Sequence, residues 1–88
     1  MAEELMKRLL GTVKDHPPYW AIYYRQLVEI VDEIKKAPYD FVEEIKKLPY
    51  TDFVSVYQEF VGFSDLPEEV ENELETEYVA RGPSNTKQ

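Results

Sequence analysis

The stretch PYWAIYYRQLVEIVDEIKK, residues 18–36, decides the fold class of this chain. At helical periodicity its polar residues fall on one narrow stripe, and its apolar and aromatic residues fill a wide arc. The polar stripe consists of Arg25, Gln26, Glu29, Asp32, Glu33 and Lys36. So wide an apolar arc predicts a long central helix from about Pro18 to Lys36, with other elements packed against it.

Helical periodicity continues on both sides of this segment. The spacing of Leu5, Leu9 and Val13 predicts an amphipathic helix that ends before the His16-Pro17-Pro18 sequence, because residues before proline leave the α region. The predicted helices besides the central one cover residues 2–14, 39–48, 51–61 and 65–81. Residues 53–57 are rich in β-branched and aromatic side chains, which leaves a strand as the alternative there.

A short sequence occurs twice and marks helix boundaries. Glu33-Ile34-Lys35-Lys36-Ala37-Pro38-Tyr39 returns as Glu44-Ile45-Lys46-Lys47-Leu48-Pro49-Tyr50, and an Asp-Phe-Val sequence follows each copy. Lysines favour a helix C-terminus, proline ends a helix, and aspartate can cap the next one. The spacing predicts two capping boxes, Asp40 with Glu43 and Asp65 with Glu68.

Length and cysteine content limit the architecture. The 88 residues fit one domain, and the absence of cysteine excludes disulfides and cysteine-based zinc sites. We therefore expect an all-α fold, a compact bundle of four to five short helices. It forms a single helical domain over residues 1–82, and residues 83–88 form a disordered tail.

The formal net charge of −8 is concentrated near the C-terminus. Residues 63–88 carry seven acids and two bases, whereas residues 1–62 carry eleven acids and eight bases. Leu66, Val70 and Leu74 recur every fourth residue and predict a helix attached to the domain. The acidic face of that helix is expected to comprise Glu68, Glu69, Glu71, Glu73, Glu75 and Glu77. This charge disfavours direct nucleic-acid binding and favours a protein partner with a basic surface.

The aromatic residues at the start of the central helix suggest an interface. One helix of so small a domain cannot bury all of Tyr19, Trp20, Tyr23 and Tyr24, and tyrosine and tryptophan are enriched where proteins meet. The alternative is that these rings are ordinary core. We predict a partner or oligomer interface that also includes Ile30, and we expect a homo-oligomer formed through this helix.

No motif indicates catalysis. His16 is the only histidine, and no glycine-rich loop could hold phosphates, so we expect no catalytic residues, no metal site and no cofactor. The lysine pairs Lys35-Lys36 and Lys46-Lys47 could contact phosphate in a helix-turn-helix arrangement. Residues 51–61 contain no arginine or lysine, however, so the expected recognition helix could not read guanine.

These observations favour a non-enzymatic protein–protein interaction module, a small accessory or scaffold subunit that docks through its aromatic helix and self-associates. The main alternative is an acidic inhibitor or DNA mimic, cellular or virus-encoded, that acts through the glutamate-rich helix. The weakest is a helix-turn-helix-like nucleic-acid binder. The acidic N-terminus and the lack of a long apolar run favour a cytoplasmic protein with no membrane association. The high content of Glu, Lys, Val and Ile favours a thermophilic source.

Overall fold

A computed structural model describes residues 2–81, and these residues form five α-helices and no strand. The helices are α1 (Ala2–Lys14), α2 (Trp20–Lys36), α3 (Pro38–Lys47), α4 (Tyr50–Phe60) and α5 (Glu68–Arg81). The all-α prediction is confirmed, and the strand alternative for residues 53–57 is wrong because α4 contains them. The tail predicted for residues 83–88 lies outside the described residues.

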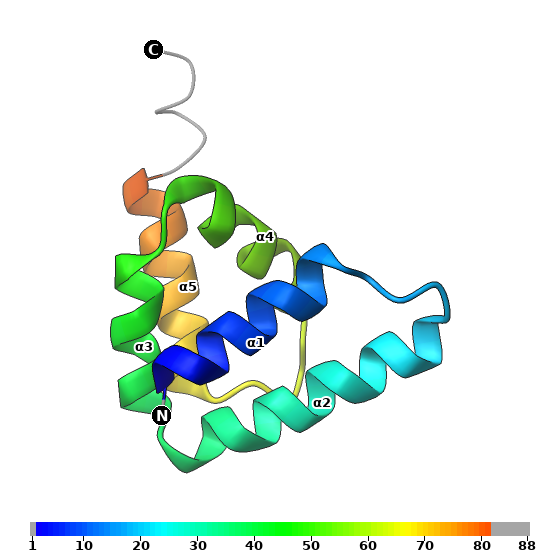
Figure 1. The fold of residues 1–88 in the computed structure, drawn as a ribbon. Coiled ribbons are helices and arrows are strands. Elements are labelled where there is room, and N and C mark those ends of the chain that lie inside the picture. The colour runs from blue at the N-terminus through cyan, green and yellow to red at the C-terminus, as the bar shows by residue number, and fades with distance from the viewer. Residues whose placement is uncertain (1, 82–88) are drawn as a thin grey trace.

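Helix α1 lies in the middle of the bundle and contacts α2, α3 and α4, while α5 packs mainly against α3 (Figure 1). Helices α1 and α2 diverge toward their connection, so this connection and the first turns of α2 project away from the other helices (Figure 1). The molecule is accordingly elongated, with principal extents of 38 × 29 × 23 Å. One end of the longest predicted helix is therefore left without a neighbour on several sides.

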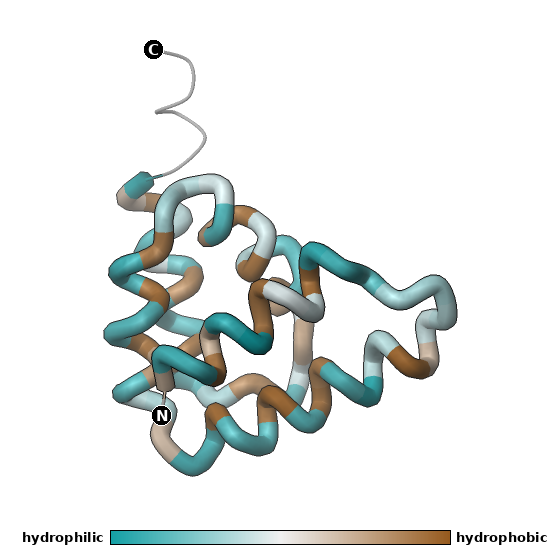
Figure 2. Tube along the Cα trace, in the orientation of Figure 1, coloured by the Kyte–Doolittle hydropathy of each residue, from teal (hydrophilic) through white to brown (hydrophobic). Residues whose placement is uncertain are grey.

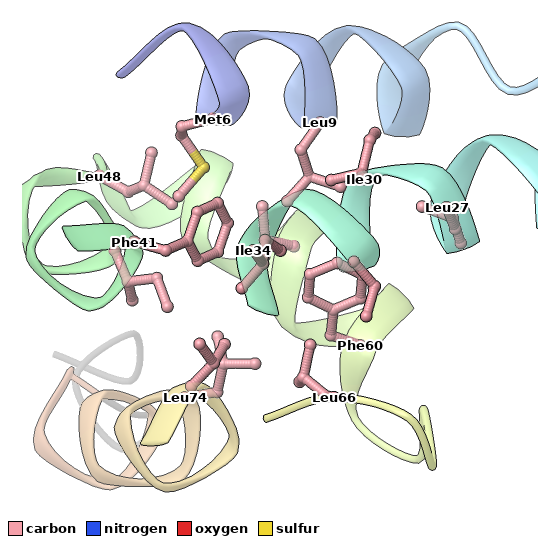
Figure 3. Close-up of a cluster of buried hydrophobic side chains, with 14 of the residues drawn as sticks. Met6, Leu9, Leu27, Ile30, Ile34, Phe41, Leu48, Phe60, Leu66 and Leu74 are labelled. Carbon is pink, nitrogen blue, oxygen red and sulfur yellow. The ribbon is translucent and has the colours of Figure 1, made fainter. Parts of the chain in front are cut away.

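One hydrophobic core joins all five helices. Hydrophobic positions are turned mainly toward the space between the helices, and hydrophilic positions lie outside (Figure 2). The close-up shows Met6 and Leu9 from α1, Ile34 from α2, Phe41 from α3 and Leu74 from α5 converging on this space (Figure 3). No polar or charged residue in the described part of the chain is buried. The core therefore depends mainly on apolar packing.

The helix starts differ from the predicted capping boxes. Asp40 lies inside the first turn of α3, whose N-cap is Ala37 and has no side-chain hydrogen bond. Helix α5 begins at Glu68, and the Asp65 carboxylate accepts a hydrogen bond from Lys35 Nζ at 2.7 Å instead. Both capping boxes are therefore wrong. The physical reason at α3 is Pro38, whose fixed φ suits the first helical position, so that Asp40 falls inside the first turn and not at the N-cap.

Each copy of the repeated sequence is followed by a phenylalanine that packs in the core, which the repeat itself did not indicate. Phe41 is the fourth residue of α3, and Phe53 is the fourth residue of α4. Both side chains are fully buried. The second copy contains one extra residue, Thr51, between its tyrosine and its aspartate, and α4 starts at the tyrosine and not at the proline. The insertion therefore keeps the phenylalanine at the same helical position.

Helix α5 is held to the body along its length. Leu66, Val70 and Leu74 are buried, which confirms the attachment predicted from their fourfold spacing, and Tyr78 is half-buried beside them. At its end, Arg81 donates hydrogen bonds to the carbonyls of Leu48 and Lys46, at 2.5 and 2.9 Å.

The Arg81 guanidinium carbon also lies 5.0 Å from the centre of the Phe53 ring. An arginine of α5 thus caps the C-terminus of α3, where the helix dipole favours a cation.

Candidate protein-docking surface

The first turn of α2 carries exposed aromatic side chains. Tyr19 is 70% exposed, Trp20 68% and Tyr24 45%, and Ile22 is also exposed. We call these four residues the aromatic tip. Tyr19 has an extended backbone, and its carbonyl accepts hydrogen bonds from the N–H groups of Ile22 and Tyr23. The helix therefore begins at the point where the chain leaves the prolines, beyond the cover of α1 (Figure 1).

Two rings of the aromatic tip are held in place by a ladder of aromatic contacts. The Trp20 ring stacks on Tyr24 with centroids 5.1 Å apart and an interplanar angle of 16°. Tyr24 stacks on Phe63 at 5.8 Å, and Phe63 contacts the buried Phe60 at 5.7 Å. The ladder runs from solvent to the core. These exposed rings are thus pre-organised, which lowers the entropy lost when a partner binds them.

Tyr23 and Ile30 belong to the core and not to the exposed surface. Tyr23 is 3% exposed and Ile30 is 1% exposed, and both lie on the same side of α2 as the buried Leu27. The separation of seven residues between Tyr23 and Ile30 is close to two helical turns, which gives them the same orientation. A partner of the folded chain cannot reach them, and this corrects the predicted interface for these two residues.

Tyr23 also forms a hydrogen bond with a residue of α4. Its hydroxyl donates a hydrogen bond to the Glu59 carboxylate at 2.5 Å, and the His16 ring stacks on it with centroids 3.6 Å apart. Burial, the hydrogen bond to Glu59 and the negative charge of Glu59 all raise the Tyr23 pKa above its ordinary value. His16 Nδ1 also lies 2.7 Å from the Pro17 carbonyl oxygen, so the histidine is a loop residue that covers Tyr23.

The charge around the aromatic tip differs from that of the whole chain. Segment 14–25 contains Lys14, Asp15 and Arg25 as its only formally charged residues at neutral pH, which gives a net charge of +1 in a chain of −8. Residues 61–64, which include Phe63 at the base of the ladder, contain no charged residue. These two segments therefore carry little of the negative charge of the protein, although the Glu59 carboxylate of α4 reaches the neighbouring Tyr23.

The six glutamates predicted to form one acidic face are divided by the packing of α5. Glu68, Glu71 and Glu75 are exposed, whereas Glu69, Glu73 and Glu77 are partly covered. Glu77 forms an ion pair with Arg81 at 2.8 Å. Burial, a hydrogen bond with Glu77 and the charge of Glu77 raise the pKa of Glu73. Two of the six thus interact next to α3 and do not form part of an open face.

The lysines considered for phosphate contact already have acidic neighbours. Lys35 lies 2.7 Å from Asp65, and the other three each lie 3.3 Å from a glutamate three residues earlier. These pairs are Lys36 with Glu33, Lys46 with Glu43, and Lys47 with Glu44. These acids offset part of the positive charge that would attract a nucleic-acid phosphate.

A recess with a volume of about 340 Å³ lies away from the aromatic tip. It is lined by Ala2, Glu4, Leu5, Arg8, Glu33, Lys36, Ala37, Asp40 and Phe41. Both acids and bases line this recess, and Glu33 and Lys36 form an ion pair with each other. Among residues 2–81, no group of three or more His, Cys, Asp or Glu side chains could hold a metal ion. In the same range, no helix has the length and apolarity needed to cross a membrane.

Comparison with known proteins gives no relative: no protein-family model, curated sequence or solved structure matches the chain.

Proposed function

We propose that this protein is a non-enzymatic protein–protein interaction module, a small accessory or scaffold subunit that docks through its aromatic tip. The observation that carries the proposal is the exposure of Trp20 and Tyr24 at the end of a ladder anchored in the core. Rings that served only the core would be covered, and rings on a loose loop would lose entropy on binding. These rings are both exposed and held in place, as an interface anchor requires.

The energetic argument concerns apolar area. Each ring of the tip exposes roughly 100 Å² or more, given that aromatic side chains bury about 150–250 Å² when fully covered. Covering such area contributes about 25 cal/mol per Å². Three rings together therefore supply several kcal/mol before the costs of association. Tyrosine and tryptophan are also the residues that most often dominate measured interfaces.

A second candidate is the acidic inhibitor or DNA mimic, and the exposure of Glu68, Glu71 and Glu75 on α5 supports it. A mimic needs a regular array of negative charge that a basic groove can cover. The involvement of Glu73 and Glu77 next to α3 weakens that array. Nucleic-acid binding is the least supported candidate, because the four candidate lysines already lie beside acids.

Affinity capture from the source organism tests the proposal. The full chain should retain a partner, and Trp20→Ala should lose it. Tyr39→Ala is the matched control, because Tyr39 is 68% exposed on α3 but belongs to no aromatic ladder among the described ring contacts. Binding of the purified partner should change little between about 50 and 500 mM salt, because apolar contacts are not screened.

The opposite pattern would favour the mimic. A partner that survives Trp20→Ala, is lost when Glu68, Glu71 and Glu75 are changed together to glutamine, and dissociates steeply with salt would refute docking through the tip.

A further inference from the structure

We infer that the aromatic tip binds a second copy of this chain in a twofold symmetric contact, in which the Trp20–Tyr24 pair of one copy faces that of the other. This inference rests on the proposed docking surface and adds the identity of the occupant. It differs from the interface expected from sequence, because Tyr23 and Ile30 are buried and Phe63 forms the base of the contact.

The distribution of charge supports a second copy. Two chains of charge −8 repel each other, so association is favoured at a surface where acids are few and balanced by bases. Segment 14–25, with its net charge of +1, and the uncharged residues 61–64 provide such a surface. A foreign partner attracted by the overall negative charge would be steered toward α5 and not toward the tip.

The shape of the molecule also permits a contact between the tips of two copies. The tip projects at one side of the molecule, and α5 lies toward the opposite side (Figure 1). The longest extent of the chain is 38 Å, which exceeds the screening length of about 8 Å at physiological salt several-fold. Two copies that meet at their tips therefore keep their α5 helices far enough apart for the repulsion to be screened.

The tip is also suited to meet a copy of itself. A twofold contact places the same patch on both sides, so a patch with one strong sign of charge is excluded. The rim here has both signs, Asp15 at the end of α1 and Arg25 on α2. The nearly parallel rings of Trp20 and Tyr24 present aromatic faces that can pack offset against identical faces.

The apolar area of the two tips determines the expected affinity of the dimer. At roughly 100 Å² or more for each exposed ring, two tips bury on the order of 700–900 Å² in total. This is below the 1,200–2,000 Å² of stable complexes and in the range of transient ones. We therefore expect a weak dimer with a dissociation constant on the order of 100 μM.

Sedimentation and fluorescence of the full chain test the inference together. The weight-average mass should rise from monomer toward dimer between about 10 μM and 1 mM, and the rise should persist at high salt. Trp20 is the only tryptophan, so its emission should shift to shorter wavelength over the same concentration range as the ring leaves water. Tyr24→Glu should remain a monomer, and Tyr39→Ala should behave as the wild type.

The helical circular-dichroism spectrum of Tyr24→Glu verifies its fold, and Trp20→Gln serves as a second variant for sedimentation. A wild-type chain that remains a monomer at 1 mM would overturn the inference, as would a dimer that survives both variants. If the chain is a monomer but the capture experiment retains a foreign protein through Trp20, the docking function stands and the second copy is excluded. If it dimerises through the tip and captures nothing, self-association is the only supported docking.

Discussion

The aromatic tip and helix α5 expose opposite kinds of side chain to solvent. Helix α5 buries Val70 and Leu74 against the rest of the chain and exposes charge, although Val79 near its end is also exposed. The tip exposes Trp20 and Tyr24 and has little net charge. Under the proposed function, the contact surface is the apolar tip and not the segment with the strongest charge. Solvated glutamates are stable in water, whereas covering exposed aromatic rings lowers the free energy of the system.

The first prediction tests the attachment of α5, and it has the largest expected effect. Leu74→Ala removes a fully buried side chain and should lower the free energy of unfolding by about 2–5 kcal/mol. Chemical denaturation followed by circular dichroism measures this value. Val79→Ala is the control on the same helix, because Val79 is exposed and its truncation should have almost no effect. An equal effect of both variants would mean that α5 is not packed on the core.

The second prediction tests the cap that α5 places on α3. Arg81→Ala should lower the free energy of unfolding by about 1–3 kcal/mol, because it leaves the carbonyls of Leu48 and Lys46 without these hydrogen bonds and removes a cation from the α3 C-terminus. Amide hydrogen exchange near that end of α3 should also accelerate. Arg25→Ala, an exposed arginine on α2, should change neither quantity. Unchanged exchange in Arg81→Ala would contradict the capping role.

Much of the fold could be predicted from the sequence because its periodicities are local. The fourfold spacing of Leu66, Val70 and Leu74 correctly identified the buried face of α5, and the prolines correctly separated α1 from α2 and α3 from α4. The capping boxes failed because the two helices start later or earlier than the spacing predicted, at Pro38 in α3 and at Glu68 in α5.

The site was harder to predict, because it depends on contacts between distant segments. An arc that is apolar on several sides does not reveal which side faces the core, so Tyr23 and Ile30 could not be separated from Trp20 and Tyr24. The stacking of Tyr24 on Phe63 joins α2 to residues far along the chain. The local sequence pattern around Trp20 and Tyr24 therefore could not predict the aromatic contacts that hold these rings in place.

The third prediction concerns the raised pKa of Glu73. The folded state binds a proton there more tightly than the unfolded state, so this group stabilises the fold below its ordinary unfolded pKa and loses that contribution as pH rises through its folded pKa. Glu73→Gln should therefore raise the melting temperature at pH 7 by a small amount, and the gain should shrink toward pH 4.

Glu29→Gln is the matched control for Glu73→Gln, since it removes one exposed acid from α2. A melting temperature at pH 7 that is unchanged or lower in Glu73→Gln would show that Glu73 is not disfavoured as an ion.

The fourth prediction has the smallest expected effect on stability and separates the two regions. Trp20→Ala should change the free energy of unfolding by no more than about 0.5 kcal/mol, because the Trp20 side chain is mostly exposed. Thermal denaturation at low protein concentration, where the chain is monomeric, measures this. A loss comparable to that of Leu74→Ala would mean that Trp20 belongs to the core and not to a docking surface.

Site-specific photo-cross-linking tests the central claim most directly, namely that the aromatic tip is the contact surface of the protein. A benzoylphenylalanine replaces Tyr19 in one variant and Tyr39 in another, and both tyrosines are similarly exposed. At several hundred micromolar protein, or in the native lysate, irradiation should yield cross-linked products from position 19 and almost none from position 39. Equal yields from the two positions, or products only from a probe at Val79 on α5, would contradict docking through the tip.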